Sequence, residues 1–374
     1  MARFLRLSFM MSALIALAFG TDVCLRRLPI RTVAFRQWEV AEFAPTALGP
    51  WVPGLRYRNP KSYGDLSNFA NLPQYRVSRT DVFTSDADGF RNTPGATGQV
   101  RIVVAGDSFM AGGSLSDSET LSAQLSALTG VAAYNAAPKV TWQVLDQVLA
   151  RHQVRNGLVV LGISEGRITS NLFLDSSETW IDSAMRRVAP SFQKELRTTE
   201  IRTTAWLEYS PLRVFLSRAF RSIENDKYLP NPGAALVGPM ELTNGHRMLF
   251  YTNAPKSVFF ANESDAGYFV RVRERVRQTG NELLVVMIPG RYRVYRPLMK
   301  SGGLLDSAYA RLIPALDRAG VPAIDLTPLM STQAAELLPQ GKYNFQDDDT
   351  HWNRLGVHCA AEAIAARWKQ MSQP

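Results

Sequence analysis

A serine follows directly after a short apolar run in the first third of the chain. Residues 102–105 are Ile-Val-Val-Ala, and Gly-Asp-Ser-Phe follows at 106–109. A nearly uninterrupted β-branched run predicts a strand buried on both faces of a parallel sheet. A serine at the carboxyl end of such a strand, just before a helix, lies where open α/β sheets bind their ligands. Ser108 is therefore a candidate nucleophile, and the alternative is that it only caps the following helix.

A serine hydroxyl is a weak nucleophile at neutral pH, so it needs a positioned base that a carboxylate orients. The chain has four histidines. Only His351 stands at a predicted strand-to-helix junction with acidic neighbours, in Asp-Asp-Asp-Thr-His-Trp-Asn at 347–353. We take His351 as the candidate general base. The alternative is a histidine that caps a helix within an acidic loop.

These two segments together resemble a known family. Residues 106–109 and 348–351 are similar to the first and last sequence blocks of the SGNH (GDSL-type) hydrolase superfamily. Asp-Thr-His-Trp at 349–352 also resembles its periplasmic branch, the alginate O-acetyltransferase-like proteins. Most of the superfamily has its acid three residues before the histidine, which corresponds to Asp348. The alginate-type proteins have it two residues before, which corresponds to Asp349. The resemblance slightly favours Asp348 and leaves Asp349 as the alternative acid.

The resemblance also implies an oxyanion hole, and here the sequence departs from the superfamily. The backbone N–H of Ser108 is the first expected donor, next to Asp107 in the same cleft. The second block corresponds to Asn135 and lacks a clear glycine, and the third places Ser164 where an asparagine is usual. Asp107, Asn135 and Ser164 are the candidate oxyanion or cleft residues. The alginate-type branch also lacks the standard blocks, so the departure points to that branch.

The surrounding sequence predicts an α/β fold. Strands are expected at 102–105, 131–135, 158–163, 283–289 and 321–326, with helices at 117–130, around 144–149, at 264–279, at 307–319 and after His351. This alternation predicts a three-layer sandwich with a central, mostly parallel sheet of about five strands, of the SGNH/flavodoxin-like type. Strand ends share one edge of such a sheet, so Ser108 and His351 are expected to meet in one cleft.

Three other regions complete the predicted organisation. An apolar run at 7–20, with Arg3 and Arg6 before it, predicts a signal peptide or signal anchor within 1–25. The run is shorter than the ~20 residues that span a membrane comfortably, so both alternatives stay open. Residues 26–95 are expected to form an extended lead-in to an SGNH-like domain at 96–374.

Inside that domain the alternation of strands and helices lapses at about 170–262. This range includes an amphipathic pattern at 205–223 and a Pro/Gly-rich patch at 229–234. An interruption of this kind within an α/β frame is usually an insertion that forms a lid or one wall of a cleft. We expect a helical or irregular subdomain with that role.

Composition excludes several classes of function. With 46% apolar and 20% charged residues, the chain can bury a large core. The two cysteines, Cys24 and Cys359, predict no disulfide framework. No zinc-ligand spacing, recognition helix or basic-aromatic pattern occurs, so we expect no metal, no cofactor and no nucleic acid. The formal charge of +9 can steer the protein toward an anionic surface or glycan.

Together with the predicted signal segment, the resemblance implies an exported O-acetyltransferase that acts on an extracytoplasmic polysaccharide through an acetyl-Ser108 intermediate. The expected compartment is the periplasm, with the N-terminal segment as a candidate inner-membrane anchor and a membrane acetyl-carrier protein as a candidate partner. The first alternative is a periplasmic acetyl or carbohydrate esterase with the same triad. The second is a non-catalytic glycan-binding component of a polysaccharide secretion system, which the missing second- and third-block residues favour.

Overall fold

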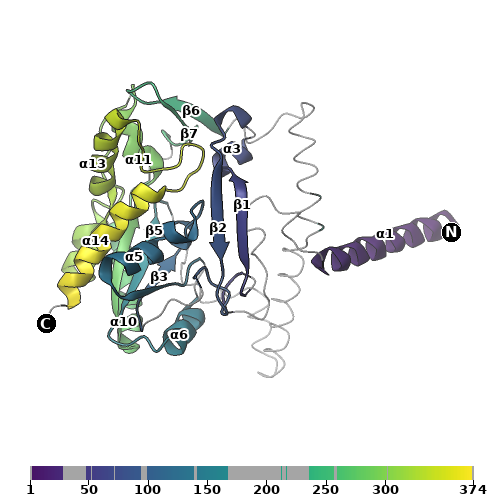
Figure 1. Ribbon diagram of the computed structural model, residues 1–374, viewed down its shortest axis with the longest axis horizontal. Coiled ribbons are helices and arrows are strands. Elements are labelled where there is room, and N and C mark those ends of the chain that lie inside the picture. Colours follow the sequence, from purple (N-terminus) through teal and green to yellow (C-terminus); the bar gives the residue numbers. More distant parts are fainter. Residues whose placement is uncertain are drawn as a thin grey trace. The chain divides into compact units, whose positions relative to one another are not determined.

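The computed structural model describes two compact units of the chain (Figure 1). One comprises Met1–Val52 and Ser177–Pro230, and the other comprises Pro53–Ser176 and Asn231–Pro374. The residues described are 2–27, 48–51, 53–70, 72–93, 99–138, 141–166, 212, 216, 236–256, 259–300 and 302–372. The second unit carries every candidate site residue named above.

A five-stranded parallel sheet forms the centre of the second unit, with strand order β4-β3-β5-β8-β9. Its strands are β3 (Val100–Gly106), β4 (Ala132–Asn135), β5 (Leu158–Ser164), β8 (Glu282–Ile288) and β9 (Ala323–Asp325). The central strand β5 is buried along its whole length. The prediction of a parallel five-stranded sheet is therefore confirmed, and the apolar runs of β3, β5 and β8 form strands that are buried along most or all of their length.

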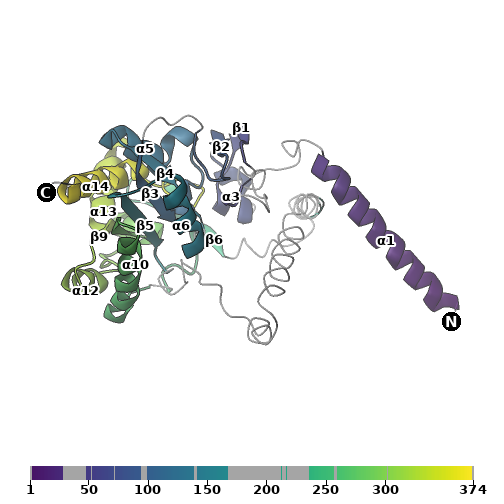
Figure 2. The ribbon, with the colours of Figure 1, turned by 90° about the horizontal axis from the view of Figure 1, so that it is seen from below.

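Helices cover both faces of this sheet (Figure 2). One face carries α5 (Leu121–Thr129), α13 (Thr327–Leu337) and α14 (Arg354–Ser372), and the other carries α6 (Trp142–Arg151), α10 (Ala266–Gln278) and α12 (Leu312–Arg318). This is the predicted three-layer sandwich. The sequence did not predict α13, and α12 begins later than the expected helix at 307–319.

Short helices fill the connections between these larger elements. They are α3 (Asp65–Phe69), η2 (Pro73–Tyr75), α4 (Ser108–Ala111), η3 (Asp117–Glu119), η6 (Glu263–Asp265), α11 (Arg291–Tyr295), η7 (Arg296–Leu298) and η8 (Leu338–Gln340). Two of them divide predicted helices, since η3 precedes α5 and η6 precedes α10. The helix α4 matters most for function because it begins at Ser108.

Two antiparallel strand pairs lie outside the central sheet. The first joins β1 (Arg56–Ser62) to β2 (Arg79–Thr84), so the segment expected as an extended lead-in contains regular structure. The second joins β6 (Val237–Glu241) to β7 (Arg247–Tyr251), within the range expected as an insertion. Apart from 212 and 216, the patterns at 205–223 and 229–234 fall outside the described residues. The predicted domain limits stay predictions.

The two strand pairs are linked through α3. A cluster of buried side chains joins Leu66 and Ala70 of α3 to Val237 of β6 and Leu249 of β7. The backbone N–H of Leu249 also donates to the carbonyl of Asp347. Both strand pairs therefore lie next to the acidic loop that carries His351, where they can shape the candidate site.

In the first unit, the helix α1 (Ala2–Arg27) contains the apolar run predicted as a signal segment. Its stretch Arg6–Leu25 is long and apolar enough to cross a membrane, and no other helix in the described part of the chain meets that criterion. A signal sequence near an N-terminus would meet it too. The helix thus agrees with either a signal peptide or a membrane anchor.

Candidate active site

The turn between β3 and α4 brings Ser108 to the edge of the sheet. Gly106 has a φ of 142°, and a Cβ there would lie 2.4 Å from the carbonyl oxygen of Gly162 on β5. Only glycine fits this close approach. Asp107 caps the helix, because its carboxylate accepts a hydrogen bond from the Phe109 N–H at 3.0 Å. Ser108 is therefore the first residue of α4, and its side chain lines a cavity.

Three side chains that are distant in sequence form a hydrogen-bonded chain at this edge. The Ser108 Oγ lies 2.8 Å from His351 Nε2, and His351 Nδ1 lies 2.6 Å from Asp349 Oδ1. A carboxylate can only accept, so Nδ1 carries the hydrogen and Nε2 accepts from the serine hydroxyl. His351 and Asp349 are both buried. This is the geometry that a general base needs to take the proton of a serine nucleophile.

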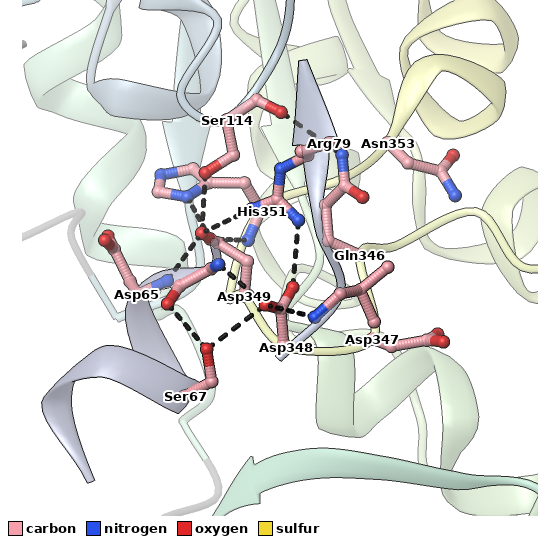
Figure 3. A network of polar contacts seen from close by, with 12 residues as sticks. Asp65, Ser67, Arg79, Ser114, Gln346, Asp347, Asp348, Asp349, His351 and Asn353 are labelled. Atoms are coloured by element: carbon pink, nitrogen blue, oxygen red, sulfur yellow. Dashed lines mark hydrogen bonds and ion pairs between the residues drawn. The ribbon is translucent and has the colours of Figure 1, made fainter. Parts of the chain in front are cut away.

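The structure places Asp349, rather than the slightly favoured Asp348, against His351. Both oxygens of the Asp348 carboxylate are directed to the segment that contains α3 and β2 (Figure 3). Its partners are the Gly64 N–H at 2.7 Å, the Ser67 hydroxyl at 3.1 Å, the Val77 N–H at 3.1 Å and Arg79 Nη1 at 2.9 Å. The preference for Asp348 as the orienting acid is thus corrected: this carboxylate anchors the N-terminal strand pair to the loop.

Several neighbours hold Asp349 in its ionised form. Its Oδ2 accepts from the Asp65 N–H at 2.8 Å and from the Ser114 hydroxyl at 2.6 Å, and Arg79 Nη2 lies 3.6 Å away. Burial alone would raise the pKa of Asp349, but the charge and hydrogen bond of His351, with Arg79 and Ser114, lower that pKa far below its usual range. Asp349 therefore stays a carboxylate at neutral pH.

The same pairing strengthens His351 as a base. Burial alone would lower the pKa of His351. The charge of Asp349 and its hydrogen bond outweigh burial, and the pKa of His351 is raised above its usual value. An imidazole with a raised pKa holds a proton more firmly, which suits the imidazolium that forms when the serine attacks.

Arg291 shapes the loop that carries the acid and the base. It follows β8 and is buried, with its Nη1 donating to the carbonyl of Asp349 and its Nη2 donating to that of Asp347 at 2.8 Å. Its guanidinium carbon lies 4.6 Å from the ring centroid of Phe250. Burial lowers the pKa of Arg291 to about 10, so it remains charged at neutral pH. The sequence analysis missed Arg291, although it stands at the carboxyl end of a parallel strand, as Ser108 does.

A cavity of about 520 Å³ opens in front of the serine. Ser108, Ser164 and His351 line it, together with residues of β7 and α11. Several of the lining residues, including Phe250 and Tyr251, fall within the range predicted as an insertion that walls a cleft.

Of the predicted oxyanion or cleft residues, Ser164 lines the cavity, whereas Asn135 and Asp107 do not. Asn135 is fully buried and does not line the cavity; its amide donates to the carbonyls of Met110 and Ala111, so it supports α4 from behind. The Ser164 hydroxyl donates to Asp107. Its proton is therefore committed to that carboxylate and does not serve as a side-chain oxyanion donor in this arrangement. The Ser108 N–H, at the first turn of α4, remains the expected donor.

A carboxylate oxygen of Asp65, one of Asp349 and a ring nitrogen of His351 lie within 4.8 Å of one another. Such a set can in principle bind a metal ion. Both ring nitrogens of His351 are however engaged, one by Ser108 and the other by Asp349. The set fits a proton relay better than a metal centre.

Replacing Gly113 by alanine should impair the site without disturbing the sheet. A Cβ at this position would lie 2.9 Å from His351 Nε2 and 3.1 Å from both Cδ2 and Cε1. The imidazole would have to move away from Ser108, and a displacement of about 1 Å can cost on the order of 100-fold in rate. Steady-state hydrolysis of an activated acetyl ester measures this. Gly267→Ala on α10, whose Cβ would meet only Arg271 at 3.8 Å, is the control; equal rates for the two variants would contradict the expectation.

The structure thus links a serine, a histidine and an aspartate in this order at one edge of a parallel sheet that helices cover on both faces. Residues 249–374 match the family model described as an SGNH hydrolase-like domain of the acetyltransferase AlgX. This confirms the resemblance predicted from the two motifs. The matched range contains Asp349 and His351, whereas Ser108 precedes it.

No curated protein matches the chain. Among solved structures, the chain is similar to the protein YXIM of Bacillus subtilis, with a TM-score of 0.37 and 11% identity over 79% of this chain. The similar region covers 62% of that protein, so the present chain spans less than two thirds of its length. A second solved structure has a TM-score of 0.34 and 11% identity, covering 73% of this chain and 97% of the other.

Proposed function

We propose that the protein transfers an acetyl group to a hydroxyl acceptor through an acetyl-Ser108 intermediate. The observation that carries the proposal is the hydrogen-bonded chain from Ser108 through His351 to Asp349, which opens on a cavity. A relay that served only to cap a helix would not need a buried acid on the far side of the histidine. The similarity of residues 249–374 to an acetyltransferase family supports the same chemistry.

The reaction would proceed in two balanced steps. In the first, the Ser108 Oγ attacks the acetyl carbonyl carbon while His351 Nε2 takes its proton, and the donor leaves with that proton. In the second, an acceptor hydroxyl attacks the acetyl-serine carbonyl, its proton passes to His351, and His351 returns a proton to the departing Ser108 Oγ. The Ser108 N–H would stabilise the oxyanion in both steps, and Asp349 would stabilise the imidazolium.

The proposed acceptor is a polysaccharide outside the cytoplasm, and a membrane acetyl-carrier protein is the proposed source of the acetyl group. The apolar helix α1 supports export or anchoring, which fits the periplasm. The cavity supports a sugar substrate, because its walls combine the aromatic rings of Phe250, Tyr251 and Tyr292 with polar groups such as Asn253. Pockets of this composition bind ligands that have both apolar and hydrogen-bonding faces.

The alternative enzyme, an esterase, differs only in using water as acceptor. Purified protein should be given p-nitrophenyl acetate with and without oligosaccharide acceptors. The proposal predicts an acetylated sugar product and a nitrophenolate release rate that rises with acceptor concentration. Release of acetate that is unaffected by sugar, with no acetylated sugar, would contradict transfer and favour the esterase. Absence of any Ser108-dependent release would favour the non-catalytic glycan-binding alternative.

A further inference from the structure

The turn that follows α4 lies against both the base and the acid of the relay. Residues 112–114 are Gly-Gly-Ser. Gly113 lies next to His351, as the 2.9 Å between its ideal Cβ position and Nε2 shows. The Ser114 hydroxyl donates to Asp349 Oδ2 at 2.6 Å (Figure 3). His351 uses the other oxygen of the same carboxylate, Oδ1. The chain of hydrogen bonds therefore continues beyond the acid to Ser114, which the sequence motifs did not include.

Ser114 has a backbone conformation that favours glycine. Its φ is 60°, and its side chain is buried. Within the ranges that the structure describes, the other two non-glycine residues with a positive φ, Gln153 and Asn156, are both exposed. A left-handed conformation costs a non-glycine residue about 1–3 kcal/mol, and it persists only where the surroundings hold it. Because residues of this kind cluster at functional sites, the strain directs attention to the Ser114 side chain.

Buried side chains hold the turn in this conformation. The guanidinium of Arg91, which is 3% exposed, donates to the carbonyl of Gly112 and, at 2.5 Å, to that of Leu115. The carbonyl of Ser114 accepts from Gln346 Nε2 at 3.2 Å, which ties the turn to the loop that carries the acid and the base. The Ser114 hydroxyl is thus presented to Asp349 at a fixed place.

A hydroxyl in this position changes how the carboxylate acts on the histidine. The ionised carboxylate can only accept, so Ser114 is the donor. Burial raises the pKa of Asp349, and the Ser114 hydrogen bond is one of the contacts that outweigh it, together with His351 and Arg79. A donor that stabilises the charge on Oδ2 makes the carboxylate less basic, and a less basic carboxylate holds the proton on His351 Nδ1 less strongly.

We propose that Ser114 is a positioning residue of the relay, which orients Asp349 and limits how strongly this carboxylate stabilises protonated His351. The inference rests on the proposed function, in which His351 must be neutral to take the proton of Ser108. Asp349 raises the pKa of His351 over the opposing effect of burial. Without the Ser114 hydroxyl, the imidazole would be protonated up to a higher pH and a smaller fraction of it could act as base.

Other charges also act on this pair. Arg79 lowers the pKa of Asp349, and after Asp349 itself, Asp65 and Asp107 raise the pKa of His351. All of them remain in place when Ser114 is replaced. A change in the titration of His351 in such a variant therefore reports the loss of the hydroxyl.

The test follows the titration of His351 by nuclear magnetic resonance in protein with isotope-labelled histidine rings. The chain has four histidines, and the signal of His351 is the one that His351→Ala lacks. In Ser114→Ala the titration should move to higher pH, which is opposite to the direction expected for Asp349→Asn. A structural role for Ser114 alone would not predict this direction.

The kinetics provide a second readout. The initial burst of nitrophenolate from p-nitrophenyl acetate reports acetylation of Ser108. In Ser114→Ala its rate should fall by about 3- to 10-fold on the acidic limb of the pH–rate profile, because a hydrogen bond to a charged group is worth about 1.5 kcal/mol or more and part of it reaches His351. Above that limb the rate should stay within a few-fold of that of the unmodified protein.

Two further variants complete the test. Ser114→Gly removes the same hydroxyl and relieves the backbone, since glycine readily adopts a φ of 60°. It should show the same shift, also where Ser114→Ala fails to fold. Ser116→Ala is the matched control, because that hydroxyl donates to the carbonyl of Thr80 at 3.2 Å instead of to Asp349. The titration of His351 should stay in place in this control.

Three results would overturn the inference. They are a His351 titration that is unmoved or moves to lower pH in the folded Ser114 variants, an equal rise in Ser116→Ala, and a burst rate that falls by the same factor at every pH. Absence of a burst in the unmodified protein would overturn the proposed function instead. The resonance titration requires no acetyl transfer, so it distinguishes the two failures.

Discussion

Replacing His351 by alanine should slow acetylation of Ser108 by about 10⁴- to 10⁶-fold. The imidazole is the only group observed within hydrogen-bonding distance of Ser108 Oγ among the described residues, at 2.8 Å, so no other side chain there can take the serine proton. The rate of the nitrophenolate burst with p-nitrophenyl acetate measures the loss directly. Far-ultraviolet circular dichroism would show that the fold is kept.

His246→Ala is the matched control for this experiment. His246 also pairs with an aspartate, since its Nε2 lies 3.1 Å from Asp347 Oδ2, but it stacks on Tyr343 and does not line the cavity. Its loss should leave the burst rate within a few-fold of that of the unmodified protein. A His351→Ala variant that reacts as fast as His246→Ala would contradict the assignment of the base.

Asp349→Asn should lower the rate by about 10³- to 10⁴-fold, because the amide can stabilise the wrong tautomer of His351 and cannot stabilise its cation. The pH dependence provides a second readout. The base acts when neutral, and Asp349 raises the pKa of His351, so loss of this carboxylate should lower that pKa. The acidic limb of the pH–rate profile should then move to lower pH. The negative charges of Asp65 and Asp107 still raise the pKa of His351 in this variant, so the limb moves only by the part that Asp349 contributes. An unmoved limb would count against the pairing.

Asp348→Asn tests whether the other buried aspartate of this loop stabilises the fold rather than orients the base. Asp348 is fully buried and pairs with Arg79 Nη1 at 2.9 Å. Breaking this pair should lower the free energy of unfolding by about 3 kcal/mol, which urea denaturation measures. The acidic limb of the pH–rate profile should not move in this variant, because Asp348 does not contact His351. If Asp348→Asn moved the limb and Asp349→Asn did not, the two assignments would have to be exchanged.

The central sheet could be predicted because its strands are short apolar runs with polar corners. Residues 102–105 and 158–163 fall within β3 and β5, and 283–288 fall within β8. Burial on both faces removes the need for alternation, so the apolar run is itself the signal. Ser108 and His351 could be paired for a related reason: the carboxyl ends of parallel strands share one edge.

The choice between Asp348 and Asp349 could not be made from spacing alone. The two residues are adjacent, and their carboxylates are used on opposite sides of the loop, one by Arg79 and the other by His351. What decides between them is a segment 284 positions earlier, where Gly64 and Asp65 donate their N–H groups to the two carboxylates. No local pattern reports a contact over that separation.

The hydrogen-bond partners of the candidate oxyanion and cleft residues could not be predicted, for another physical reason. The resemblance to the second family block suggested Asn135, but its side chain is buried beneath α4 and donates to carbonyl groups of that helix. Ser164 does reach the cavity, yet its hydroxyl is used by Asp107. Position along a strand could be predicted, whereas the partner that each polar group selects depends on the packed structure.

The central claim is that Ser108 is the nucleophile of an acyl-transfer site, and covalent labelling tests it most directly. The protein should be incubated with a fluorophosphonate probe, and the modified residue located by mass spectrometry of its peptides. We predict one label per chain on Ser108, absent from Ser108→Ala and formed far more slowly in His351→Ala. Labelling of Ser108→Ala at the rate of the unmodified protein, or no label on Ser108 in the unmodified protein, would contradict the claim.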